Sequence, residues 1–224
     1  MTIWIIHRRV FMIQSKKDYI FYLKADEIAL KKQRGTVQYY RDYLLDDIWR
    51  FERLIRKREF YINCKKGIIY KPYSLYLYFK FQRLSTKLGF TIPPNVFGPG
   101  LSIAHKGTLI VNSNVKVGEN CRIHTGVNIG TNAYSMEDEL RPDFVLPVPK
   151  IGNNVYIGPG VKIFGDIEIA DNIAIGANSV VNKSFKEEGI TIAGVPAKKV
   201  SSEGFDKCYY KTTDILRGFY KPPQ

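Results

Sequence analysis

Residues 151–181 have the sequence IGNNVYIGPGVKIFGDIEIADNIAIGANSVV, in which an aliphatic residue returns every six positions. A second aliphatic column follows four residues after each of the first four members. A helix does not repeat with this period, whereas a β-solenoid does, with two inward side chains and a tight corner in each hexad. The first column is Ile151, Ile157, Ile163, Ile169, Ile175 and Val181, and the second is Val155, Val161, Ile167 and Ile173.

The same period continues toward the N-terminus and is interrupted once. Ile129 and Ile151 are 22 residues apart, which is not a multiple of six, so residues 132–150 are predicted to form an extruded loop. At three hexads per turn, the repeats predict about four coils. The earlier columns are Val111, Val117, Ile123 and Ile129, followed by Val115, Cys121 and Val127.

Composition and charge indicate a folded protein with a basic N-terminal part. The chain has 224 residues, of which 45% are hydrophobic, enough to bury a substantial core. Residues 1–90 carry 20 Lys and Arg against 8 Asp and Glu, whereas the rest is nearly neutral. Such a surface attracts an anionic partner, such as lipid headgroups, or is a solvated helical face. The basic N-terminal region shows no nucleic-acid-binding motif.

The remaining composition indicates a cytoplasmic protein, with peripheral contact at the inner membrane face as a further possibility. The three cysteines are an odd number at spacings unlike those of metal ligands. No run approaches the roughly 20 apolar residues that a membrane span needs. The first eleven residues do not have the order of a signal peptide, because His7-Arg8-Arg9 follows the apolar run.

Two helices are predicted in the first 65 residues. Ser15 begins the first, over 15–32, and Gly35 ends it. Apolar residues at helical spacing predict a second helix over 40–62. Its apolar line is Tyr40, Leu44, Ile48, Phe51, Ile55 and Ile62.

A third helix is predicted between Pro72, which suits a first turn, and Gly89, which suits a C-terminal cap. Its Tyr and Phe residues are interpreted as packing between helices and against the base of the solenoid. The alternative is a belt at a membrane interface. The helices would then cap the open backbone edge of the solenoid. The expected apolar line is Leu75, Phe79, Leu84 and Leu88.

These elements predict an α+β chain in three parts. A basic helical region over 1–90 precedes a solenoid domain over 91–200, which carries the loop 132–150. A C-terminal tail over 201–224 holds a short helix near 214–219.

The chain resembles the hexapeptide-repeat acyltransferases, in the serine acetyltransferase-like branch that includes polysaccharide O-acetyltransferases. The resemblance rests on the repeats, on Ala104-His105-Lys106-Gly107 before them and on Ala193-Gly194-Val195-Pro196-Ala197-Lys198 after them. It implies a left-handed parallel β-helix, acetyl-CoA as co-substrate without a metal, and a homotrimer with active sites between neighbours.

The resemblance assigns the general base to His105. Transfer from a thioester to a hydroxyl needs a base for the hydroxyl proton, and histidine serves near neutral pH. Extended strictly backward, however, the hexad register places His105 in the inward column, where it would be a buried structural histidine. Catalysis is the favoured interpretation, because regular packing is least enforced in the first coil. His124 is a candidate for contact with the acceptor.

Two departures from serine acetyltransferases shape the expected acceptor. The resemblance places an orienting Asp where this chain has Phe90, and an Arg-His pair that holds the serine carboxylate where it has Pro147-Val148. A neutral sugar hydroxyl, in a polysaccharide or its lipid-linked precursor, is therefore the expected acceptor. Serine O-acetylation is the alternative. The expected acceptor-binding residues are His124, Asn128, Asp138 and Asp143.

Small corner residues and basic residues are expected to bind acetyl-CoA. Gly158, Gly176 and Ala177 would let the pantetheine arm lie close to the backbone, although any tight corner also demands small residues. Lys183 and Lys198 are expected to meet its phosphates.

Two other functions share the solenoid. A zinc enzyme of the γ-carbonic anhydrase kind needs three histidines, two of them five residues apart, whereas His105 and His124 are 19 apart. A non-enzymatic trimeric scaffold that binds an anionic surface would leave the position of His105 unexplained.

Overall fold

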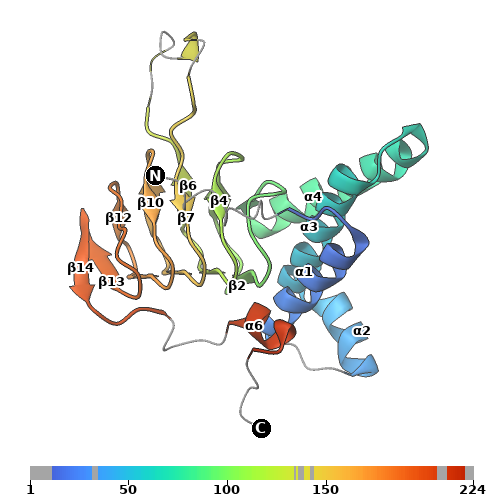
Figure 1. Ribbon diagram of the computed structural model, residues 1–224. Coiled ribbons are helices and arrows are strands. Elements are labelled where there is room, and N and C mark those ends of the chain that lie inside the picture. Colours follow the sequence, from blue (N-terminus) through green and yellow to red (C-terminus); the bar gives the residue numbers. More distant parts are fainter. Residues whose placement is uncertain are drawn as a thin grey trace.

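The computed structural model describes residues 12–31, 35–133, 135, 139–141, 144–205 and 211–219. Helices gather at one end of the molecule and a stack of short parallel strands forms the rest (Figure 1).

The strands form a parallel β-helix with three sheets. Strands at equivalent positions in successive coils are neighbours within a sheet. The first sheet holds β1 (Phe90–Thr91), β3 (Leu109–Val111), β6 (Asn128–Gly130), β9 (Lys162–Phe164) and β12 (Val180–Val181). The second holds β4 (Lys116–Val117), β7 (Lys150–Ile151) and β10 (Glu168–Ile169). The third holds β2 (Ser102–Ile103), β5 (Arg122–Ile123), β8 (Tyr156–Ile157), β11 (Ala174–Ile175), β13 (Thr191–Gly194) and the antiparallel β14 (Ala197–Ser201).

The hexad columns form the core, as the period predicts. Every member of the two columns from Val111 to Val181 is at most 5% exposed. Cys121 is one of them, and burial raises the pKa of its thiol. The register break is confirmed as well, because the loop between β6 and β7 leaves the β-helix and stands away from it (Figure 1).

The helices are α1 (Lys16–Ala29), α2 (Thr36–Leu45), α3 (Asp47–Cys64), the short 3₁₀ helix η1 (Ile68–Tyr70), α4 (Lys71–Leu88) and α6 (Thr212–Arg217). The Ser15 side chain caps α1 by accepting a hydrogen bond from the Asp18 N–H. Gly89 ends α4 in the left-handed conformation, at φ 77°, where a side chain would also press against the backbone of Gly107. Within the described residues, no helix is long and apolar enough to cross a membrane.

The single helix expected over 40–62 is wrong. The chain forms α2 and α3 with a break at Asp46, whose side chain caps α3 by accepting from the Trp49 N–H. An N-terminal cap satisfies a donor that would otherwise lack a partner, so Asp46 starts a new helix inside the apolar pattern. Tyr40 and Leu44 are consequently exposed on α2, while Phe51 and Ile55 are buried on α3.

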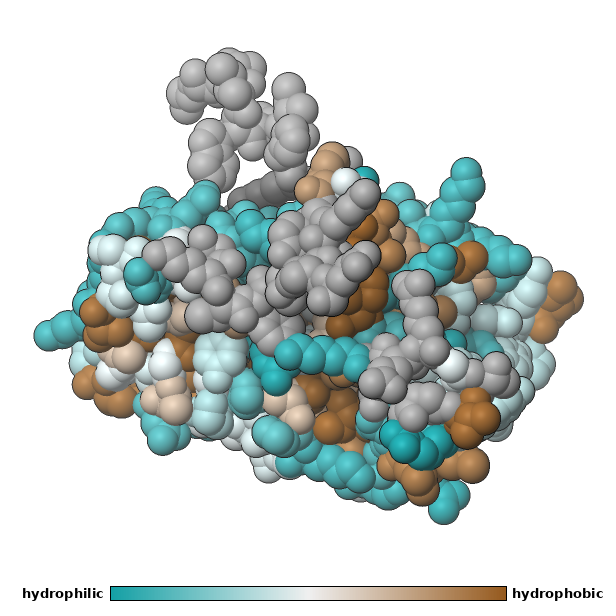
Figure 2. Space-filling view, turned by 90° about the horizontal axis from the view of Figure 1, so that it is seen from below, coloured by the Kyte–Doolittle hydropathy of each residue, from teal (hydrophilic) through white to brown (hydrophobic). Residues whose placement is uncertain are grey.

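The expected apolar line of the third helix is also wrong in part. Leu84 and Leu88 are buried, together with Leu77 and Phe81, but Leu75 and Phe79 are exposed. The aromatic stripe is therefore only partly core, because one face of α4 packs on α3 and the other faces solvent. Figure 2 shows hydrophobic side chains among hydrophilic ones at the helical end of the molecule.

A buried arginine joins the helices to the first coil. Arg56 of α3 is fully buried and donates to the carbonyl oxygens of Phe97, at 2.8 Å, and Gly98, at 2.7 Å. It also pairs with Asp26, at 2.7 Å, and with Glu59, at 3.0 Å. Burial disfavours the charged guanidinium, but these two carboxylates keep the pKa of Arg56 above its usual value.

Buried carboxylates satisfy the N–H groups of the same coil. Asp26 accepts from the N–H groups of Gly100 and Leu101, Glu59 from that of Asn95, and Glu52 from that of Ile103. Burial raises the pKa of Glu52 well above its usual range, which favours its protonated form. The helices therefore cap the open edge, as expected, and they do so through hydrogen bonds that the apolar pattern does not reveal.

The C-terminal helix returns to the helical end and packs on α1 (Figure 1). Arg217 of α6 forms a two-pronged ion pair with Glu119, at 2.6 and 2.7 Å. Thr212 and Thr213 hydrogen-bond the side chain of Asn120. The short helix expected near 214–219 is thus present two residues earlier than expected.

Candidate active site

One corner of the β-helix carries most of the residues singled out by sequence. The third sheet aligns the last residues of its strands, and each strand is followed by this corner. The backbone hydrogen bonds continue one residue further, from the His124 N–H to the Ile157 oxygen and from the Gly158 N–H to the Ile175 oxygen. The resulting corner row is Ala104, His124, Gly158, Gly176 and Ala193.

His105 lies at the first corner and is exposed. Eight residues separate the inward Ile103 from the inward Val111, whereas six separate Ile123 from Ile129. The backward extension of the register, which places His105 inward, is therefore wrong. The two extra residues widen this corner and leave the imidazole in solvent.

Helical residues hold the segment on both sides of His105. Before it, the Ile103 N–H donates to Glu52 at 2.9 Å. After it, the Gly107 N–H donates to the Leu88 oxygen at 3.1 Å. These contacts anchor the widened corner to α3 and α4.

Lys106, next to His105, is tied to the start of α3. Its ammonium group lies 2.8 Å from the carboxylate of Asp47, which also pairs with Lys87 at 2.8 Å. The hydrogen bonds from these lysines lower the pKa of Asp47 from 3.8 to about 2. The stabilisation from this depressed pKa is present above the unfolded-state pKa and is lost as the pH falls through about 2, so the tie persists at neutral pH.

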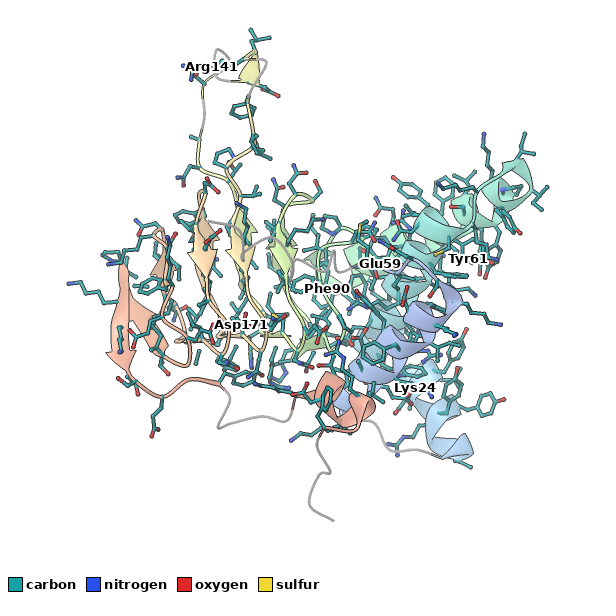
Figure 3. The ribbon with its side chains drawn as sticks, in the orientation of Figure 1. Lys24, Glu59, Tyr61, Phe90, Arg141 and Asp171 are labelled. Atoms are coloured by element: carbon teal, nitrogen blue, oxygen red, sulfur yellow. The ribbon has the colours of Figure 1, made fainter. Side chains whose placement is uncertain are left out.

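Phe90 turns its side chain into the core. It is 3% exposed, and its ring meets that of Phe51 edge to face at 5.1 Å between centroids. Figure 3 shows it where the helices meet the β-helix. The residue that stands in place of the expected Asp therefore serves the core, and the positioning of the His105 segment comes from Glu52, Asp47 and Leu88.

His124 lies beside His105 and is half-buried. Its ring centroid is 5.9 Å from that of His105 and 5.2 Å from that of Tyr156. Burial, then the charge of Arg122, then His105 lower the pKa of His124, so the neutral ring is favoured at neutral pH. Among the described residues, its Nε2 atom is buried and has no hydrogen-bond partner.

Arg122 and Tyr156 were not expected from sequence, yet both lie against His124. Arg122 precedes His124 by two residues on the outward face of the sheet and donates to the Ser102 hydroxyl at 3.0 Å. Tyr156 pairs in register with Arg122. The loop 132–150 separates the two residues in the sequence, and its length is not a multiple of six. Counting hexads without the loop would have placed Arg122 and Tyr156 at the same position of successive coils.

The small residues of the corner row are required by the stacking of the coils. A Cβ atom on Gly158 would lie 2.7 Å from the Ile175 oxygen, and one on Gly176 would lie 2.9 Å from the Cβ of Ala193. Ala177 follows Gly176 and is exposed. The row therefore presents a narrow backbone edge that leads away from the two histidines.

The two lysines expected to bind phosphate lie at different corners of the β-helix. Lys198 on β14 pairs with Ala193, the last member of the corner row, and is exposed. Lys183 follows β12 at a different corner and lies over the Phe185 ring. Only Lys198 continues the row.

The expected acceptor-binding residues are also dispersed. Asn128 is half-buried on β6, in the neighbouring sheet, whereas Asp138 and Asp143 lie outside the described residues. Figure 3 shows Arg141 at the far end of the loop, well away from the body of the β-helix. Among the described residues, no group of three His, Cys, Asp or Glu could hold a metal ion.

Known proteins match parts of the chain. The family described as bacterial transferase hexapeptide (six repeats) matches residues 149–183. The serine acetyltransferase of Buchnera aphidicola is 31% identical over 140 residues, which are 62% of this chain and 47% of that protein. The serine acetyltransferase of Staphylococcus epidermidis is 35% identical over 117 residues, 52% of this chain and 51% of that protein.

Solved structures match over a larger share. A serine acetyltransferase of Brucella abortus, in complex with coenzyme A, has a TM-score of 0.64 and 25% identity, covering 85% of this chain and 70% of that one. The serine acetyltransferase of Neisseria gonorrhoeae has a TM-score of 0.62 and 25% identity, covering 90% and 72%. The chain carries the hexapeptide repeats of this transferase family over residues 149–183 and resembles serine acetyltransferases over a larger part. Its fold is the expected left-handed β-helix preceded by helices.

The expected sugar acceptor is wrong. The relatives and solved structures that this hexapeptide-repeat protein resembles are serine acetyltransferases, which supports the alternative. The expectation relied on Phe90 in place of the orienting Asp and on the missing Arg-His pair at Pro147-Val148, and a group missing at one position does not exclude its counterpart elsewhere. The chain spans about half the length of the curated relatives it matches.

Proposed function

We propose that the protein transfers the acetyl group of acetyl-CoA to the hydroxyl of L-serine. The observation that carries the proposal is the exposed His105 beside the half-buried His124, at one end of a row of small corner residues. The similarity to serine acetyltransferases, one of them solved with coenzyme A, supports both the donor and the acceptor.

His105 is the proposed general base. Its imidazole takes the proton of the serine hydroxyl as the oxygen attacks the thioester carbonyl carbon. The tetrahedral intermediate then collapses, the C–S bond breaks, and the imidazolium returns the proton to the departing thiolate. The products are O-acetyl-L-serine and CoA, and the base ends in its starting state.

Arg122 and His124 are the proposed acceptor-binding residues. The serine carboxylate needs a cation, and Arg122 supplies one two residues from His124 on the same outward face. The half-buried ring of His124 would pack against the acceptor beside His105. This pair would take the place of the Arg-His anchor that residues 147 and 148 do not provide.

The corner row is the proposed path of acetyl-CoA. Gly158, Gly176 and Ala177 keep side chains out of the way of the pantetheine arm, and Lys198 at the end of the row meets a phosphate. His105 at the other end then faces the thioester.

Replacement of Arg122 by Met is expected to raise the KM for L-serine roughly 10- to 100-fold, because a hydrogen bond to a charged group contributes about 1.5–3 kcal/mol. The measurement is thiol release from acetyl-CoA at varied L-serine. L-Serinamide lacks the carboxylate, so its low turnover should be the same in the wild type and in Arg122→Met.

Lys150→Met is the matched control, since Lys150 is an exposed cation on another sheet, 3.7 Å from Asp166. It should leave the KM for L-serine unchanged. A rise in Lys150→Met alone would move the carboxylate anchor to Lys150. Turnover of the wild type on L-serine no greater than background acetyl-CoA hydrolysis would refute the proposed function.

We also propose that three chains form the active unit. In one chain the histidines and the corner row lie on an open edge, and a neighbouring chain would close it into a groove that excludes water. Light scattering at micromolar concentration is expected to give three times the 25.8 kDa of one chain. A monomer under active conditions would show that one chain builds the whole site.

A further inference from the structure

The first half of α4 has apolar residues on two opposite faces. Leu77 and Phe81 belong to the buried face, which packs on α3. The other face steps through residues 72, 75, 76 and 79, which is helical spacing. Its Leu75, Tyr76 and Phe79 are 55%, 54% and 62% exposed. Nothing in the described chain covers this second face.

The preceding turn extends the exposed face. Ile68 and Ile69 of η1 are each 76% exposed. Together with the exposed stripe they form a patch that we call the aromatic tip, defined as Ile68, Ile69, Leu75, Tyr76 and Phe79. The end of α3 and start of α4 project away from the β-helix, so the tip lies at an extremity of the molecule (Figure 1).

The charges of the chain segment that carries the tip have one sign. No Asp or Glu occurs between Glu59 and Glu119. Lys66, Lys71 and Lys80 are exposed within or beside the tip. The Lys80 ammonium lies 5.9 Å from the ring centroid of Tyr76, so basic and aromatic groups alternate over the surface.

We propose that the aromatic tip docks on an anionic lipid surface. Apolar and aromatic side chains of an amphipathic helix enter the boundary between headgroups and acyl chains, while the surrounding ammonium groups meet anionic headgroups. The tip supplies both components at one extremity of the chain. The tip lies away from the corner row, so docking on lipid does not depend on which acceptor receives the acetyl group.

Charge favours lipid over a second copy of the chain. Two tips that met face to face would bring their lysines together with no acidic residue in the segment to neutralise them. Val37 and Leu44 of α2 are exposed as well, on a different helix from the tip, and they serve as the control below.

The test is sedimentation of the full chain with large vesicles of phosphatidylcholine alone or mixed with phosphatidylglycerol. We expect binding to the mixed vesicles and little to the neutral ones. Lys66→Gln/Lys71→Gln/Lys80→Gln should weaken binding by roughly fivefold for each lysine removed. Leu75→Ser/Phe79→Ser should weaken it at least tenfold, since both apolar side chains lose their burial in the membrane.

The matched control is Val37→Ser/Leu44→Ser, which removes two still more exposed apolar side chains from α2 and should leave vesicle binding unchanged. Light scattering and acetyl transfer of each variant are measured alongside and should match the wild type. Absence of binding to mixed vesicles, or equal binding by the tip variants, overturns the proposal. A change of oligomeric state in Leu75→Ser/Phe79→Ser without a change in vesicle binding would make the tip an interface between copies.

Discussion

Replacing His105 by alanine is expected to lower the rate of acetyl transfer by roughly two to four orders of magnitude, the usual contribution of a general base. His105 is exposed, so the substitution removes no core packing, and the fold should be retained. Acetyl-CoA affinity should change little, because the proposed cofactor contacts lie along the corner row. Steady-state kinetics and calorimetric titration with CoA measure the two quantities separately.

His124→Ala is the matched comparison. The His124 ring is close to His105, but its proposed role is to bind the acceptor. The variant should therefore raise the KM for L-serine and keep most of kcat. A His105→Ala rate within threefold of the wild type would place the base elsewhere, and His124 would be the next candidate.

Replacing Arg56 by methionine is expected to cost about 3–5 kcal/mol of unfolding free energy, as breaking a buried ion pair usually does. The variant leaves Asp26 and Glu59 buried without their cation, and it leaves the carbonyl oxygens of Phe97 and Gly98 without a donor. Urea denaturation at a fixed protein concentration measures the loss, since association would otherwise change the apparent stability.

Arg53→Met is the control on the same helix. Arg53 is half-buried and lies over the Trp49 ring at 4.7 Å, so its replacement should cost about 1 kcal/mol or less. If both variants lost a similar amount of unfolding free energy, Arg56 would contribute only ordinary packing, and the hydrogen bonds that cap the β-helix would not account for its effect.

Local patterns predicted the elements that depend on neighbours in the chain. The six-residue period identified the inward columns correctly because each hexad repeats the same backbone geometry. Ser15 and Gly89 were placed correctly for a similar reason, since a cap depends on the few residues around it. Asp46 shows the limit, because the apolar pattern runs across the break and hides a new cap.

Contacts between distant residues escaped prediction. Arg56 looks in sequence like any basic residue of a charged helix, yet apart from Glu59 its partners lie 30 to 42 positions away. The partners Lys106 and Asp47 are 59 positions apart. The pairing of Arg122 with Tyr156 spans the extruded loop, whose length removes the hexad phase as a guide.

The sequence by itself determined the β-helix, its interior and the histidine at its first corner, because a six-residue period and a short motif are local properties of the chain. Only the tertiary structure decided that His105 is exposed, since the two extra residues of its corner become visible when β2 pairs with β5 and β3 pairs with β6. It likewise decided that Phe90 is core and that Arg122 lies beside His124. Contacts between stacked coils and helices determine both facts, and the sequence separation of the contacting residues does not reveal such contacts.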